Sequence, residues 1–308
     1  MQARSLASLP VELICEVTQY LNGEDVGMLW LCGNVVLNTK LSAGGVQKVE
    51  FKPHLVGTRL QKFPPFMASL KQLRSFILLP FEYKKGFDSV EQWSSFPSNI
   101  RRLAFKGDFN VSAFTPLLQT TPHPLPHLKE LELGVYKEGL QPVLDRLEEL
   151  LPGLEKLELA RMPNQGPPIL TVLRLPRTLT HLRSAAFHLR LSSTEATQQR
   201  EEWPPGLSSL ILDELPWSFN LACLPQTLKY LELHNHSIYS PGQFDWSLLP
   251  SNLEHLALYN FKNVQDLFMK IPFTARAPIK SLNLGYSYQM QPVAVSEEFI
   301  ESTLAFIQ

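Results

Sequence analysis

The hydrophobic residues of this chain recur in one short pattern, in which an apolar residue is followed three and five positions later by two others. Ten copies of the pattern begin at Val46, Leu73, Ile100, Leu128, Leu154, Leu179, Leu207, Leu228, Leu253 and Ile279. Successive copies start 21 to 28 residues apart, and only the sixth ends in a polar residue, Ser184. Because alternate residues of a strand share one face, each copy predicts a short strand, and the regular period predicts a solenoid of stacked units.

The segments between the copies contain turn residues and one amphipathic stretch. A proline stands just before the pattern in six units, at Pro97, Pro126, Pro152, Pro176, Pro225 and Pro250. Proline has a fixed φ and no backbone donor, so it suits the residue that turns the chain into a strand. Residues 141–151 place Pro142 at a helix start and continue with helical apolar spacing, which predicts a helical return on the outer face.

This pattern resembles leucine-rich repeats over roughly residues 46–290. The expected fold class is α/β, a leucine-rich-repeat solenoid of about ten repeats of roughly 26 residues. The chain departs from the family at the asparagine that normally forms a ladder between units. That position holds an apolar or aromatic residue in five units, at Tyr136, Met162, Phe187, Leu215 and Phe261. We therefore expect apolar spines in place of the ladder.

Solenoids need their ends covered, and residues 291–308 predict a C-terminal capping helix. Ser296 can serve as the N-cap, and acidic residues follow it in the first turn. Four residues then form an apolar helical face: Phe299, Ile300, Leu304 and Ile307.

Residues 1–45 follow no repeat and predict three short helices. Residues 9–21 read Leu-Pro-Val-Glu-Leu-Ile-Cys-Glu-Val-Thr-Gln-Tyr-Leu, and Asp25 and Asn34 begin the second and third helices. This Leu-Pro-x-Glu-Leu-Ile start, continued by residues 29–38, resembles an F-box of the fungal type. The resemblance implies a substrate receptor of a cullin-based SCF ubiquitin ligase, bound through a Skp-type adaptor. The adaptor-binding positions that it implies are Leu9, Pro10, Leu13, Ile14, Val17 and Leu21.

A physical argument favours the same interpretation of this segment. Some 45 residues in three short helices cannot bury a sufficient core by themselves, so their excess apolar side chains must pack on the first repeat or on a partner. An amphipathic helix laid into a partner's groove is one solution. The alternative is that residues 1–45 only cap the solenoid.

Charge and cysteine content limit the partners and the compartment. Twenty-eight basic and 29 acidic residues give a formal net charge of −1, which argues against nucleic acid and anionic membranes as partners. Charged residues interrupt the first thirty positions, and no stretch has the roughly 20 apolar residues of a membrane span. The three cysteines are too few for a disulfide framework. We expect a cytoplasmic or nuclear protein.

The sequence offers no convincing catalytic or cofactor motif. Gly44-Gly45 is not followed by the Lys-Ser/Thr pair of a phosphate loop. The nearest approach to a metal site is Glu232-x-His234-x-His236, whose outer members stand too far apart along a strand to hold one ion. We therefore expect a non-enzymatic protein without cofactor or metal.

The residues that flank the strand leucines are expected to face the concave surface. Over residues 181–259 this surface gathers aromatic and polar side chains, the composition favoured in interface hot spots. The candidate substrate-binding residues are His181, Arg183, Tyr230, Glu232, His234, His255 and Tyr259. Their mixed charge favours a polypeptide partner of unknown identity. Two functions remain open: a ligase substrate receptor, and a leucine-rich-repeat scaffold or inhibitor that binds a protein without any ligase.

Overall fold

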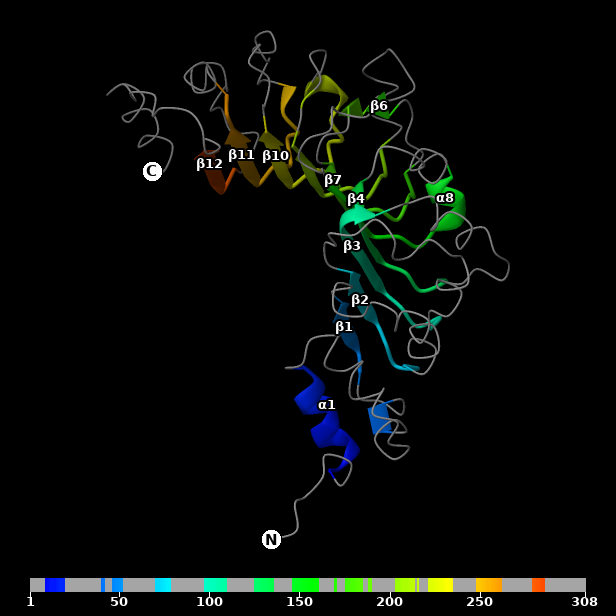
Figure 1. Cartoon of the computed structure of the whole chain (residues 1–308). Helices are drawn as coiled ribbons and strands as arrows, with labels where there is room; N and C mark the ends of the chain where they lie inside the picture. Colours follow the sequence, from blue (N-terminus) through cyan, green and yellow to red (C-terminus); the bar gives the residue numbers. More distant parts are fainter. Residues whose placement is uncertain are drawn as a thin grey trace. The chain divides into compact units, whose positions relative to one another are not determined.

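The computed structural model of the chain is drawn in Figure 1. It describes residues 9–19, 40–41, 46–51, 70–78, 97–109, 125–135, 146–160, 169–170, 175–184, 188–189, 203–213, 215, 221–234, 248–261 and 279–285. The chain divides into two compact units, Met1–Gly166 and Pro167–Gln308. The boundary falls inside the stretch that the sequence assigns to repeats.

The first unit contains five parallel strands, paired in chain order. They are β1 (Lys48–Phe51), β2 (Ser75–Leu78), β3 (Arg102–Phe109), β4 (Glu130–Val135) and β5 (Lys156–Ala160). The register shifts only within the longer β3, between Phe105 and Phe109. The unit also contains helix α1 (Val11–Gln19) and the single-turn helix α8 (Leu147–Leu150).

The second unit repeats the arrangement with five more parallel strands. They are β7 (His181–Ser184), β9 (Ser209–Leu212), β10 (Tyr230–His234), β11 (His255–Tyr259) and β12 (Ser281–Gly285). A separate parallel pair joins β6 (Ile169–Leu170) to β8 (His188–Leu189). The shortest step, the 21 residues from Ser209 to Tyr230, returns through the 3₁₀ turn η6 (Leu221–Cys223).

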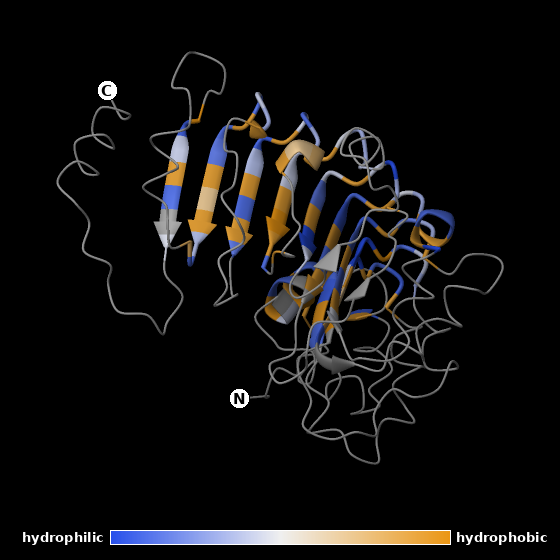
Figure 2. Ribbon diagram, turned by 90° about the horizontal axis from the view of Figure 1, so that it is seen from above, coloured by the Kyte–Doolittle hydropathy of each residue, from blue (hydrophilic) through white to orange (hydrophobic). Residues whose placement is uncertain are grey.

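Each strand of the two five-strand sets lies on one copy of the sequence pattern, whereas β6 and β8 lie between copies. The predicted solenoid of parallel strands with a spacing near 26 residues is therefore confirmed. The leucines of neighbouring repeats pair directly, as Leu210, Leu231, Leu256 and Leu282 do in the second compact unit. Burial alternates along the strands, as β10 illustrates with buried leucines between partly exposed neighbours. Figure 2 shows this alternation as hydrophobic and hydrophilic bands along the strands. Among the described residues, the apolar core lies on one face of the strands, and the side chains of the other face, here called the open face, are partly or fully exposed in β7, β9 and β10.

A β-turn leads into each described strand where the sequence predicts a turn. A backbone N–H donates to the carbonyl three residues earlier, as Ile100 does to Pro97 and Leu253 to Pro250. In two units the proline instead occupies the second turn position, at Pro126 and Pro152, where its fixed φ is favoured. The prolines therefore act as turn residues in both arrangements.

Hydrogen bonds from backbone groups and from turn side chains join each repeat to the next. The carbonyl oxygen of Lys229 accepts hydrogen bonds from the N–H groups of both Glu254 and His255 in the next repeat. Carbonyl oxygens in both compact units accept pairs of hydrogen bonds in the same way. At the turns, the Asn252 amide donates to the carbonyl of Gln226 at 2.9 Å. Two further turn side chains make the same kind of contact: the Asn99 amide donates to the Lys71 carbonyl, and the Thr227 hydroxyl donates to the Leu207 carbonyl.

The outcome at the expected apolar spine is partly determined. Leu215 and Phe261 are buried, as predicted. Tyr136, Met162 and Phe187 lie outside the described residues. The hydrogen bonds from turn side chains to the preceding repeat were not expected. They join successive repeats at a different position from the asparagine of standard leucine-rich repeats.

The helices match the sequence prediction where the structure describes them. Helix α1 begins directly after Pro10, and the Ile14 N–H donates to the Pro10 carbonyl. The return helix expected over residues 141–151 is described only as α8, with Leu147 and Leu150 buried. Most of the second and third N-terminal helices and the whole segment 291–308 lie outside the described residues. None of the helices in the described part of the chain has the length and apolar character needed to cross a bilayer.

Candidate binding face of the second unit

Polar and aromatic side chains gather on the open face of the second unit. The register explains how they come together: Tyr230 pairs with His255, and His234 pairs with Tyr259. Asp213 directly follows β9, and its position after Leu212 corresponds to that of His234 after Leu233. Side chains from three neighbouring strands therefore project onto one area.

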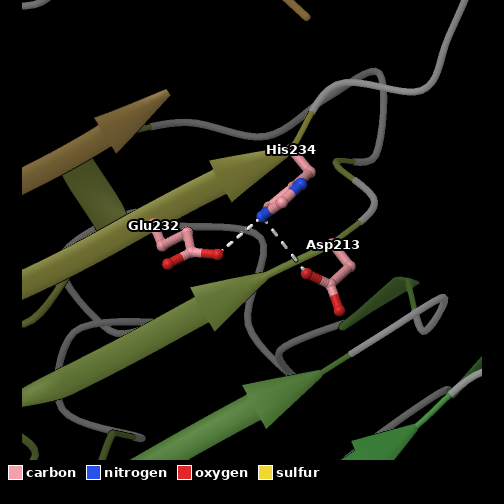
Figure 3. A group of neighbouring side chains, drawn as sticks. All are labelled: Asp213, Glu232 and His234. Carbon is pink, nitrogen blue, oxygen red and sulfur yellow. Dashed lines mark hydrogen bonds and ion pairs between the residues drawn. The ribbon is translucent and has the colours of Figure 1, made fainter. Parts of the chain in front are cut away.

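Three of these side chains converge at its centre, as Figure 3 shows. The His234 Nε2 atom lies 2.7 Å from Glu232 Oε1 and 3.5 Å from Asp213 Oδ1. Glu232 and His234 come from the same face of β10, two residues apart, whereas Asp213 comes from the end of β9. The three side chains are 15 to 19% exposed, so they are largely covered but still reached by solvent.

The second oxygen of each carboxylate is held by a neighbouring side chain. The Tyr230 hydroxyl donates to Glu232 Oε2 at 2.5 Å, and the Arg183 guanidinium donates to Asp213 Oδ2 at 3.3 Å. The hydrogen bond from His234, together with that from Tyr230, lowers the pKa of Glu232 against the opposing effect of its burial. Burial, followed by the Glu232 contact, raises the pKa of Tyr230 to about 12. Glu232 is therefore a carboxylate and Tyr230 a neutral phenol near pH 7.

Aromatic rings continue the area across β11 toward β12. The rings of His234 and Tyr259 stack with centroids 4.3 Å apart and planes 18° from parallel. Tyr259 also covers Gly285, where a Cβ would lie 2.4 Å from two ring carbons. The Asn283 amide donates to the Tyr259 hydroxyl at 3.1 Å. Glycine at position 285 thus leaves the space that the Tyr259 ring occupies.

Most of the substrate-binding candidates named from the sequence lie in this area. Tyr230, Glu232, His234, His255 and Tyr259 form a chain of contacts, in which the Tyr230 and His255 rings stand 6.2 Å apart. Arg183 joins this chain through Asp213, which lies 3.5 Å from His234. His181 lies at its edge, at the start of β7, with its Nδ1 atom 2.7 Å from the Thr180 hydroxyl. We name the area that all seven residues and Asp213 share the β7–β11 patch.

Asp213 and Asn283 were missing from the candidates. Both flank motif leucines, and aligning the units on those leucines places Asp213 beside His234. Glu232 and His236, the outer members of the sequence Glu232-x-His234-x-His236, are expected to stand too far apart along one strand to hold an ion, and His236 lies outside the described residues. The structure supplies the third ligating side chain from the neighbouring strand instead.

The open face of the first unit has a different character. Arg102 lies 3.6 Å from Glu130 and 3.7 Å from Glu132, and Lys106 lies 3.4 Å from the second oxygen of Glu132. Cations and carboxylates therefore alternate there within ion-pair distance. Exposed pairs of this kind contribute little to stability, and no comparable group of His, Asp and Glu occurs among the described residues of this unit.

The adaptor-binding candidates of helix α1 differ in exposure. Leu13 is 45% exposed, Pro10 is exposed, and Leu9 and Val17 are partly exposed. Ile14 is only 1% exposed, which gives it a packing role within the chain. Leu21 lies outside the described residues.

No protein-family model and no curated protein sequence matches this chain. Its function is therefore inferred from the motif, the open face and the contacts described above.

Proposed function

We propose that this chain is the non-catalytic substrate-recognition subunit of an SCF-type ubiquitin ligase. Its N-terminal segment is an F-box that binds a Skp-type adaptor and, through it, a cullin, and its leucine-rich repeats bind a protein substrate. The observation that carries the proposal is the Leu-Pro-x-Glu-Leu motif at the start of α1, in which Leu13 is exposed beside the buried Ile14.

The exposure of Leu13 agrees with a contact to a partner. Within the described part of the chain, Leu13 is the one large hydrophobic side chain classed as exposed. Covering the exposed part of a leucine is worth about 1 kcal/mol. A single exposed leucine is ordinary on a protein surface, so its weight comes from its place in the motif. Helices that present such residues commonly dock in an apolar groove of a partner.

The β7–β11 patch supports the second half of the proposal. Tyrosine and arginine are enriched in interface hot spots, and the patch combines two tyrosines, Tyr230 and Tyr259, with Arg183. Contacts within the patch hold these side chains in place before a partner arrives, which reduces the entropy lost on binding. We assign substrate capture to this patch rather than to the ion-paired face of the first unit.

Co-purification with a Skp-type adaptor tests the proposal. The wild-type chain and an adaptor are co-expressed, and the adaptor recovered with the chain is quantified. We expect Leu13→Asp to abolish recovery, because a charge would enter the apolar contact. Leu13 is better suited to this test than Ile14, since Ile14→Ala would open a cavity inside the chain.

Glu16→Ala is the matched control, because Glu16 is exposed on the same helix but belongs neither to the Leu-Pro-x-Glu-Leu motif nor to the implied adaptor-binding positions. We expect this variant to retain the adaptor and both variants to have wild-type circular dichroism. An adaptor that fails to co-purify with wild type, or that stays bound to Leu13→Asp, contradicts the proposal. That result favours the alternative, a leucine-rich-repeat scaffold or inhibitor that binds its partner without a ligase.

A further inference from the structure

Asp213, Glu232 and His234 present three potential metal-binding atoms to one point. One donor atom from each residue lies within 4.8 Å of the other two. Figure 3 shows the two carboxylates directed at the imidazole from opposite sides. The register of β9 and β10 pairs Leu212 with Leu233, and Asp213 and His234 are the residues that follow this pair. The Asp213 N–H donates to the Ser184 carbonyl at 3.0 Å, so a backbone hydrogen bond to β7 holds Asp213 just past the end of β9.

The contacts around the cluster orient these donors. Tyr230 holds Glu232 Oε2, and Arg183 holds Asp213 Oδ2, so the opposite oxygens, Oε1 and Oδ1, are the ones that face His234 Nε2. Stacking on Tyr259 fixes the plane of the imidazole. Outer contacts of this kind are how proteins orient the ligands of a metal.

Asp213 Oδ1 provides an independent observation. This oxygen is buried, and it has no hydrogen-bond partner among the described residues, although it lies 3.5 Å from the imidazole. A buried carboxylate oxygen without a hydrogen bond is costly. A cation bound between Asp213 and His234 would remove that cost.

One of the three donor spacings already matches a small tetrahedral ion. With metal–ligand distances of about 2.1 Å, two ligand atoms of a tetrahedral zinc site stand about 3.4 Å apart. The distance between His234 Nε2 and Asp213 Oδ1 is already 3.5 Å. In the metal-free protein, His234 Nε2 and Glu232 Oε1 share a hydrogen-bonded proton at 2.7 Å. This distance has to widen by several tenths of an ångström when an ion binds between the two atoms.

The donor set selects among metals. Calcium and magnesium prefer all-oxygen ligands, whereas an imidazole with carboxylates suits zinc and related transition metals. Two carboxylates beside one guanidinium, that of Arg183, leave a net negative charge that attracts a divalent cation.

We propose that Asp213, Glu232 and His234 bind one zinc ion on the open face of the second unit. The three side chains supply three ligands, and water from the solvent-exposed side supplies the fourth. The ion would join β9 to β10 and displace the proton shared by Glu232 and His234. This site is independent of the proposed ligase function, because it is measured on the chain alone.

Zinc titration of the purified full chain tests the site. After removal of metal with a chelator, zinc binding is followed by isothermal titration calorimetry, and bound zinc is counted by mass spectrometry after desalting. We expect the wild type to bind one equivalent of zinc more than Asp213→Asn or His234→Ala. Tyr230→Phe, which removes an orienting contact but no ligand, should weaken this equivalent roughly tenfold.

Two controls change the same residue types on the same kind of surface. His255→Ala removes a neighbouring histidine of the patch, and Glu158→Gln changes an acidic residue on the open face of the first unit; both should leave zinc binding unchanged. Asp213→Asn keeps the size of the side chain, and thermal melting verifies that each variant is folded. Equal zinc binding by wild type, Asp213→Asn and His234→Ala would overturn the assignment, as would displacement of the ion by equimolar calcium or magnesium.

Discussion

Replacing Ser184 with alanine should stabilise the second unit. Ser184 occupies the last position of the sixth repeat pattern, where it pairs with Leu212 of the next strand, and it is fully buried. Its hydroxyl has no hydrogen-bond partner among the residues that the structure describes. A buried hydroxyl in this state costs about 1–3 kcal/mol relative to its hydration in the unfolded chain.

The alanine variant removes that cost and introduces a small one. Deleting the oxygen opens on the order of 10 Å³, which costs about 0.2 kcal/mol at about 24 cal/mol per Å³. The net expectation is a gain of about 1 kcal/mol in the free energy of unfolding. For a unit of this size, that gain raises the melting temperature by about 2–4 °C.

Urea unfolding followed by circular dichroism, together with calorimetric melting, measures the change. Ser209→Ala is the control, because Ser209 lies on the partly exposed side of the adjacent strand and should change stability by less than about 0.5 kcal/mol. A Ser184→Ala variant that is as stable as wild type, or less stable, would refute the reasoning. It would mean that the hydroxyl has a partner in the folded protein.

Two further predictions concern the β7–β11 patch. Gly285→Ala should displace the Tyr259 ring, since a Cβ at position 285 would lie 2.4 Å from two of the ring carbons. NMR would detect the displacement as a loss of the ring-current shift that Tyr259 causes on the His234 protons. Unchanged shifts would contradict the prediction. Glu232→Gln should destabilise the protein above about pH 4.5 and lose this effect at lower pH. The folded pKa of Glu232 is depressed by His234, so its stabilising contribution is complete above the unfolded pKa and disappears as the pH falls through the folded value. Urea unfolding of wild type and variant between pH 3 and 7 tests this sign, and a difference that grows on acidification would reverse it.

The fold could be predicted from the sequence because its main signal is local and repeated. Leu231 and Leu233 indicate one strand, and nine other copies of the pattern agree with it in spacing. The hydrogen bonds from turn side chains could not be predicted in the same way. Asn99 and Asn252 donate to carbonyls in the preceding repeat, and nothing in their immediate sequence distinguishes them from other turn asparagines.

The candidate site could be predicted only in part. Tyr230, Glu232 and His234 alternate along one strand, so the period of two places them together. Asp213 could be placed beside His234 by aligning the repeats on their leucines, but Asp213 lies on another strand, so the alternation along one strand does not reveal it. The direction of each carboxylate oxygen depends on Tyr230 and Arg183, and such contacts depend on rotamers that a linear pattern does not specify.

The double hydrogen bonds to carbonyls such as that of Lys229 have a consequence for evolution. Main-chain N–H and C=O groups are common to every amino acid except proline, which lacks the N–H, so successive coils stay joined with almost any outward-facing side chain at these positions. Mutation can therefore rewrite the exposed surface one position at a time while the framework beneath it persists, and new partners can be acquired without a new architecture.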